Sequence, residues 1–125
     1  MWPSILAIFC GAGLGALLRA GFNFATVSIA STLPLGTFIS NMAGGYMVGI
    51  AVAFFASNPS LSPEWKLFVI TGFLGGLTTF SSFSVEVVGF MQRGEVTWAL
   101  GTALLHLAGS LALTFLGILT YQALK

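Results

Sequence analysis

The amino-acid sequence predicts an all-α membrane protein with four transmembrane helices, the third of them broken near its middle. Three observations lead to this prediction. Only 6% of the 125 residues are charged, whereas a soluble domain carries roughly 25%. The mean hydropathy is +1.01. The charged residues also leave long uncharged stretches between them, and a membrane helix needs about 20 apolar residues. A soluble enzyme is therefore excluded.

The first two helices are expected at residues 5–24 and 36–56. The first apolar stretch lacks the basic region of a signal peptide, so we expect it to remain as a membrane helix. A mixed linker at 25–35 separates the two helices. The stretch 57–63, SNPSLSP, is rich in turn-forming residues and closes the second helix.

The third and fourth helices are expected at residues 64–91 and 96–123. Pro63 and Glu64 stand where a helix start favours proline and an acidic residue. The stretch 92–95 is the next turn. Helices are preferred over strands because backbone exposed to lipid must satisfy its own hydrogen bonds. The chain is thus expected to form one four-helix domain over residues 1–125.

Composition excludes several other classes of protein. A net charge of +1 with four basic residues gives no electrostatic surface for nucleic acid. Cys10 is the single cysteine, so neither an internal disulfide nor a thiolate metal site is expected. His106 is the single histidine, which argues against a transition-metal site within one chain.

The positive charges favour neither orientation in the membrane. With four spans, both termini and the 57–64 loop share one side, where Lys66 and Lys125 lie. Arg19 and Arg93 lie toward the other side, so the count that normally decides topology is two against two. Two interpretations stay open: a weak signal in a small protein, or insertion both ways up to give antiparallel dimers.

Small residues at spacing four mark the first helix. Gly11, Gly15 and Arg19 share one face, and glycines at this spacing let helix backbones approach closely. Arg19 either extends to the membrane interface, which we favour, or attracts anions at a vestibule.

A similar stripe in the second helix begins with a carboxamide. Asn41, Gly45 and Gly49 share one face, and a carboxamide in an apolar helix must find a hydrogen-bond partner. Asn41 alone favours a bond to another helix, with donation to a passing ion as the functional alternative.

The third segment contains the unusual feature of the chain. Gly72, Gly75 and Gly76 lie near its midpoint, and each glycine costs a helix roughly 1 kcal/mol relative to alanine. Broken helices at membrane depth line cavities and often mark ion sites. Five hydroxyl residues follow the glycines: Thr78, Thr79, Ser81, Ser82 and Ser84.

Aromatic and polar pairs follow this predicted break. Phe80 and Phe83 share a face at spacing three, and Ser81 and Ser84 share a neighbouring face. Aromatic pairs at this spacing usually pack, although their positive ring edges can also face an anion. Glu86 is the one carboxylate away from a loop, and ionisable residues inside a membrane are functional candidates. Hydration near the interface is the alternative for Glu86.

The fourth helix carries a polar stripe at spacing four. Neutral polar groups in register favour a bundle interior or a polar track over a lipid-facing surface. The stripe consists of Thr102, His106, Ser110 and Thr114.

Three motifs resemble the CrcB/Fluc fluoride channel family. The run from Gly72 to Glu86, GFLGGLTTFSSFSVE, is similar to the family signature. Of the three motifs it is the most specific for this family. The stretch 36–44, GTFISNMAG, and the Gly11-x-x-x-Gly15-x-x-x-Arg19 pattern are similar as well, so that the resemblance covers essentially the whole chain. Ser82 stands where this family usually has threonine, but the hydroxyl is kept.

The resemblance implies an antiparallel homodimer with two fluoride pores. It implies that the ring edges of Phe80 and Phe83 line each pore and that Asn41 donates to fluoride. The positions that match the fluoride pathway are Asn41, Phe80, Ser81, Phe83, Ser84, His106, Ser110 and Thr114.

The resemblance also implies an ion that is not transported. Gly75 and Thr78 match positions whose backbone carbonyls, from both subunits, hold a structural sodium ion on the two-fold axis. Arg19 and Glu86 match residues near the pore entrances. The expected function is passive fluoride export giving fluoride resistance, without enzyme chemistry, in a bacterial inner membrane.

Two other classes fit the sequence less well. A small dual-topology multidrug transporter needs a buried glutamate in its first helix, and residues 5–24 contain no carboxylate. A structural membrane protein would explain the packing glycines, but not a break followed by five hydroxyl residues.

Overall fold

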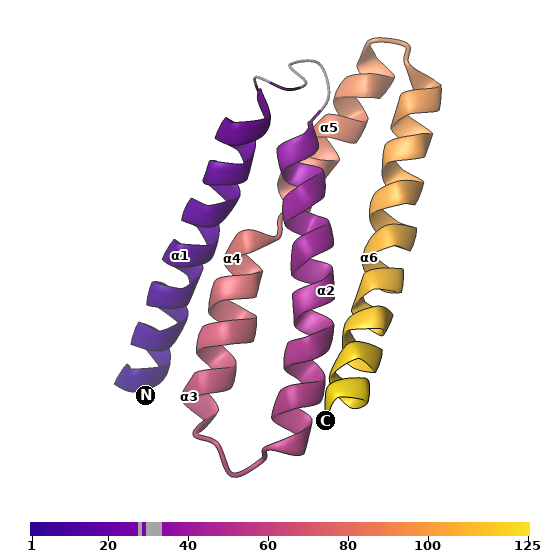
Figure 1. The fold of residues 1–125 in the computed structure, drawn as a ribbon. Helices are drawn as coiled ribbons and strands as arrows, with labels where there is room; N and C mark the ends of the chain where they lie inside the picture. Colours follow the sequence, from indigo (N-terminus) through magenta and orange to yellow (C-terminus); the bar gives the residue numbers. More distant parts are fainter. Residues whose placement is uncertain (28, 30–33) are drawn as a thin grey trace.

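The computed structural model describes residues 1–27, 29 and 34–125, and every element in them is helical. Helices α1 (Trp2–Val27), α2 (Leu35–Ser57) and α6 (Val96–Leu124) are continuous (Figure 1). Together with a third segment, Pro63–Gln92, they give four stretches long and apolar enough to cross a membrane. The predicted four-helix membrane protein is confirmed, and part of the predicted 25–35 linker lies outside the described residues.

The third segment is broken, as the sequence predicts. Its first half consists of α3 (Pro63–Lys66), the π-helical η1 (Leu67–Leu74) and α4 (Gly75–Leu77). Thr78 and Thr79 then adopt extended backbone conformations, with ψ values of 156° and 120°. The second half is α5 (Phe80–Gln92). The break therefore follows the glycine cluster instead of falling within it.

Both chain termini lie at one end of the helical bundle (Figure 1). The turn between α2 and α3 is at this same end, and the turn between α5 and α6 is at the other. This arrangement is the one expected for four antiparallel spans. Pro63 is the first residue of α3, as predicted. Gly94 has a φ of +77° in the turn before α6, a conformation that glycine adopts without steric cost.

Glycines bring α1 into backbone contact with the first half of the third segment. A Cβ atom on Gly72 would lie 2.9 Å from the carbonyl oxygen of Ile8, and one on Gly76 would collide with the carbonyl oxygen of Ala12. A Cβ atom on Gly15 would collide with the carbonyl oxygen of Phe73. Gly72 and Gly76 therefore serve close helix packing, which corrects the expectation that the glycine cluster itself interrupts the helix.

The second closely packed pair is α2 and α6. A Cβ atom on Gly49 would collide with the carbonyl oxygen of Thr114, and one on Gly117 would collide with that of Tyr46. The predicted glycine stripe of the second helix thus packs against the fourth helix.

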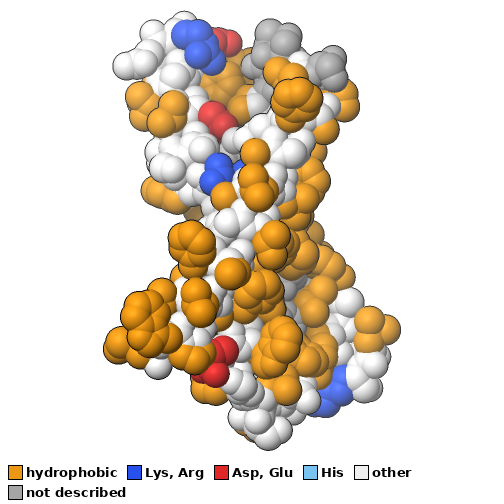
Figure 2. Space-filling model, turned by 90° about the vertical axis from the view of Figure 1, so that its left-hand side faces the viewer, with side chains coloured by type: hydrophobic (Ala, Val, Ile, Leu, Met, Phe, Trp, Pro, Cys, Tyr) orange, Lys and Arg blue, Asp and Glu red, His pale blue; other side chains and the backbone are white. Residues whose placement is uncertain are grey.

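The outer surface is largely apolar. Figure 2 shows many hydrophobic side chains on one face of the molecule, whose outline narrows at mid-height. Large hydrophobic residues are exposed on every long helix, among them Phe9, Val52, Val85 and Leu104. The buried cluster is small and contains Ala51, Leu74 and Leu77. Such a surface suits a lipid environment and not water.

Candidate functional site

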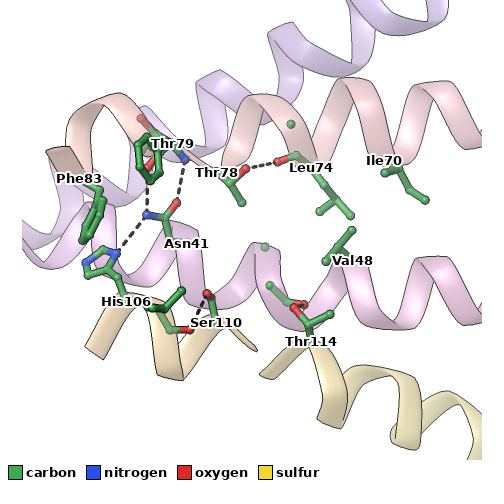
Figure 3. A pocket seen from close by; sticks show the side chains of 15 residues that line it. Asn41, Val48, Ile70, Leu74, Thr78, Thr79, Phe83, His106, Ser110 and Thr114 are labelled. Atoms are coloured by element: carbon green, nitrogen blue, oxygen red, sulfur yellow. Dashed lines mark hydrogen bonds between the residues drawn. The ribbon is translucent and has the colours of Figure 1, made fainter. Parts of the chain in front are cut away.

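A cavity of about 450 Å³ lies beside the break in the third segment. It is bounded by α2, by both halves of the third segment and by α6 (Figure 3). Its lining consists of Asn41, Gly44, Gly45, Val48, Ile70, Leu74, Gly75, Thr78, Thr79, Phe80, Phe83, His106, Leu107, Ser110 and Thr114.

The cavity brings together most residues that the sequence singled out. Its lining includes six of the positions that match a fluoride pathway, and both positions that match a sodium site. Ser81 and Ser84 are not in the lining. The Ser81 side chain is exposed, with its Oγ 3.4 Å from Thr79 Oγ1. Thr102 also lies outside the lining, so three members of the predicted α6 stripe face the cavity.

Asn41 binds the backbone of the break with both ends of its carboxamide. Its Oδ1 accepts a hydrogen bond from the Thr79 N–H at 2.7 Å, and its Nδ2 donates to the Thr79 carbonyl oxygen at 3.1 Å. Its Nδ2 also lies 3.2 Å from His106 Nδ1 (Figure 3). The predicted interhelical hydrogen bond of Asn41 is confirmed. Asn41 holds three helices together where the backbone leaves its helical path.

Two backbone N–H groups at the break donate to side chains and not to the carbonyls that a continuous helix would offer them. In an α-helix the N–H of residue i bonds to the carbonyl of residue i−4. The Thr79 N–H, which would bind the Gly75 carbonyl, donates to Asn41 instead. The Ser82 N–H, which would bind the Thr78 carbonyl, donates to Thr79 Oγ1 at 3.1 Å. The carbonyls of Gly75 and Thr78 therefore lack these two helical donors, and both residues line the cavity.

Thr79 begins the second half of the third segment as its N-cap. Its side chain accepts from the Ser82 N–H, and its own backbone is extended. An N-cap threonine satisfies one of the backbone donors that the first helical turn leaves unpaired.

Arg19 lies at the other side of the break. Its Nε donates to the carbonyl oxygen of Gly76 at 3.1 Å. This carbonyl belongs to the last turn of α4, where a positive side chain interacts favourably with the unpaired carbonyls of a helix end. The Arg19 side chain is thus bound at the break, and its expected place near a pore entrance stays a prediction.

Three hydroxyl groups of the lining donate to backbone carbonyls. Thr114 Oγ1 donates to the Gly45 carbonyl oxygen at 2.8 Å, which joins α6 to α2. Ser110 Oγ donates to Leu107 at 3.2 Å, and Thr78 Oγ1 donates to Leu74 at 2.9 Å. A hydroxyl can turn about its C–O bond, so each of these donors can exchange its carbonyl for another acceptor in the cavity.

Three aromatic rings follow one another along one side of the cavity. The ring centroids of Phe80 and Phe83 are 5.6 Å apart, and those of Phe83 and His106 are 4.7 Å apart. The predicted pairing of Phe80 with Phe83 is present. Phe80 remains 79% exposed, so most of its surface is not covered by other residues of the chain.

Known proteins resemble this chain over its full length. Residues 6–118 match the family described as CrcB-like protein, Camphor Resistance (CrcB). The chain belongs to the CrcB family. A relative from Polynucleobacter asymbioticus is 77% identical over 125 residues and covers all of both chains. Relatives from Burkholderia thailandensis and Pseudomonas syringae pv. maculicola are 56% and 53% identical, over 98% of this chain and 96% of their own length.

All three CrcB relatives carry the name fluoride-specific ion channel FluC. The family is therefore one of ion channels and not of enzymes. With its four membrane-spanning helices, the chain is a multi-pass membrane protein of this family, as the sequence motifs indicate.

Two features of this CrcB chain were missed or left open by the sequence. Thr79 was not identified as an N-cap, although a threonine immediately before the first helical residue is typical of one. Glu86 lies outside the cavity lining, and within the described residues its buried Oε1 has no hydrogen-bond partner. Its expected place at a pore entrance stays a prediction.

Proposed function

We propose that the protein is a fluoride-selective channel that lets fluoride leave the cell passively and so gives fluoride resistance. The observation that carries this proposal is the cavity at the helix break, lined by aromatic rings, a carboxamide, an imidazole and hydroxyl groups. The described lining holds no charged side chain. Relatives as much as 77% identical are named fluoride-specific ion channels, which supports the same conclusion.

The chemistry of the lining suits a small anion. Fluoride is tightly hydrated, so removal of its water is costly unless donors replace the hydration shell. The hydroxyls of Ser110 and Thr114 can turn from their backbone carbonyls toward the ion. The ring edges of Phe80 and Phe83 carry partial positive charge. Because these donors are neutral, they do not trap the ion, and a narrow aromatic passage excludes larger halides.

The pathway is completed by a second, antiparallel copy of the chain, so that a homodimer holds two pores. Phe80 is 79% exposed although it lies beside the cavity, and a partner would cover it. The molecule narrows at mid-height (Figure 2), which leaves room there for a partner. The balanced count of basic residues allows insertion both ways up. A C-terminal tag would then be labelled from both faces of the membrane, and labelling from one face alone would contradict the arrangement.

A structural sodium ion fits the carbonyls of the break. Gly75 and Thr78 line the cavity, and the helical donors for their carbonyls are redirected to Asn41 and Thr79. Neutral carbonyl oxygens suit a hard cation. Two chains that meet at this point would supply four oxygens. A structure determined in sodium should contain an ion with only oxygen contacts there, and its absence would contradict the assignment.

The experiment that tests the function measures fluoride release from liposomes that contain the purified protein. A fluoride electrode records release, and chloride release from matched liposomes is the control. A selective channel releases fluoride rapidly and chloride negligibly. In a bacterial inner membrane, the negative interior would drive fluoride outward. Equal release of both ions, or no release from a well-folded protein, would contradict the proposed function.

A further inference from the structure

The hydrogen bonds around Asn41 determine where the proton of His106 lies. Thr79 presents both an N–H donor and a carbonyl acceptor to the same carboxamide, at 2.7 and 3.1 Å. One orientation of the carboxamide satisfies both, with Oδ1 toward the N–H and Nδ2 toward the carbonyl. The Asn41 atom at 3.2 Å from His106 Nδ1 is consequently an NH2 group, which can only donate.

We propose that His106 is the neutral Nε2–H tautomer and acts as a positioning residue, whose Nδ1 lone pair holds the Asn41 carboxamide against the helix break. A proton on Nδ1 would face the Asn41 NH2 group as donor against donor. This role rests on the proposed channel function only for its effect on fluoride flux, because the position of the proton can be measured without transport.

The surroundings of His106 keep its ring in this orientation. The side chain is 7% exposed. The Phe83 ring lies 4.7 Å from it, and the Phe38 ring meets it edge-on at 5.2 Å. A ring held between two phenylalanines has little freedom to turn its Nδ1 away. Asn41 thus has two partners: His106, which α6 holds in place, and Thr79, which belongs to the third segment.

The consequence is a chain of contacts that ends at the break. His106 orients Asn41, Asn41 holds the Thr79 N–H, and the Gly75 carbonyl loses the partner that a continuous helix would give it. Within the described part of the chain, the hydrogen-bond contact of the His106 ring is at Nδ1, so its Nε2–H is not used there. This N–H group is available as a further donor, on a residue that lines the cavity.

The proton position is measured directly by solid-state NMR of the full-length protein in lipid bilayers at neutral pH. His106 is the single histidine, so histidine-selective 15N labelling gives one pair of ring signals. We expect an unprotonated Nδ1 and a protonated Nε2, with Nδ1 close to a side-chain NH2 group. A protonated Nδ1, in either the other neutral tautomer or the imidazolium ion, would overturn the assignment.

The positioning role is tested by two substitutions that differ in where they place a polar atom. In His106→Asn the carboxamide oxygen can occupy the place of Nδ1, whereas in His106→Gln the polar group falls near Nε2. Both lose the aromatic contacts with Phe83 and Phe38. We expect fluoride flux in the Asn variant to exceed that in the Gln variant about tenfold, the effect of one buried hydrogen bond.

Thr120→Val is the matched control, because Thr120 accepts a 2.9 Å hydrogen bond from Tyr46 that also joins α6 to α2, outside the cavity lining. Its flux should equal that of the unmodified protein. Equal flux in the two His106 variants, both folded, would overturn the positioning role. If the unmodified protein carries no fluoride, the proposed function fails, while the NMR result still decides the tautomer.

Discussion

The two halves of the third segment are held in place by different kinds of contact. The first half packs on α1 through glycines, so that backbone meets backbone at Gly72 and Gly76. The second half, α5, has Phe90 as its buried residue and is fixed at its start by hydrogen bonds to Asn41 and Thr79. Close backbone packing dominates in the first half, which accepts one further hydrogen bond from Arg19, whereas hydrogen bonds fix the start of the second half.

This difference explains why the cavity lies where it does. A half-helix fixed by close backbone packing cannot follow the start of α5 when that start is held by α2. The two halves separate at Thr78 and Thr79, where the backbone is extended and lies beside a cavity. Non-helical backbone at membrane depth is tolerated in such places. The candidate functional site thus lies at the boundary between two packing modes.

The largest effect is expected from a side chain added at Gly76. In Gly76→Val, atoms beyond Cβ would drive α1 away from α4, because the Cβ atom alone collides with the Ala12 carbonyl oxygen. Overpacking of this kind costs about 3 kcal/mol or more where backbone must move. We expect loss of monodisperse protein in size-exclusion chromatography. Gly13→Val is the matched control, because no atom lies within 4 Å of a Cβ atom there. Equal damage in both variants would contradict the packing account.

A smaller and more local effect is expected from Asn41→Leu. The protein should fold, because the glycine contacts remain, but the Thr79 N–H and carbonyl lose their partners. Each unpaired buried group costs about 1–3 kcal/mol. Amide hydrogen exchange should accelerate at residues 78–82 and stay slow at 67–74, and fluoride flux should fall about a hundredfold.

Asn58→Leu provides the control for this change. Asn58 bonds to the Phe54 carbonyl in an exposed turn, so its loss should leave both exchange and flux unaltered. Accelerated exchange across both halves of the third segment in Asn41→Leu would show that they are held as one unit.

The smallest effect is expected at the N-cap of α5. Thr79→Val removes the acceptor for the Ser82 N–H, a loss of about 1 kcal/mol. Thr79→Ser keeps an oxygen at this place and should retain most of the stability. Thermal unfolding in detergent, followed by circular dichroism, measures the difference. A Ser variant as unstable as the Val variant would indicate that the methyl group of Thr79, and not its hydroxyl, stabilises the start of α5.

Much of this architecture could be predicted from composition and spacing. Uncharged stretches defined four spans within a few residues of their ends, because lipid imposes helices of a known length. Spacing four on α6 placed His106, Ser110 and Thr114 on one face, and the three line the cavity. Which residues share a face follows from the geometry of one helix alone, so it can be predicted without knowing which helices pack against it.

The remaining features depend on contacts between helices. A glycine that breaks a helix and one that permits close packing look alike in sequence, and the packing at Gly72 and Gly76 is decided by α1. The partner of Arg19 is a backbone carbonyl, which no side-chain pattern reveals. Ser81 and Ser84 lie outside the cavity lining because the rotation of α5 is set by the bonds at Thr79.

The central claim is that fluoride passes through the cavity at the break. The most direct measurement compares fluoride release from liposomes with Phe83→Ile and with Phe54→Ile. Phe83 lines the cavity, whereas Phe54 packs against Tyr121 outside its lining. The account predicts that Phe83→Ile strongly reduces fluoride release while the protein still forms dimers, and that Phe54→Ile conducts normally. Undiminished release by a folded Phe83→Ile protein would contradict it.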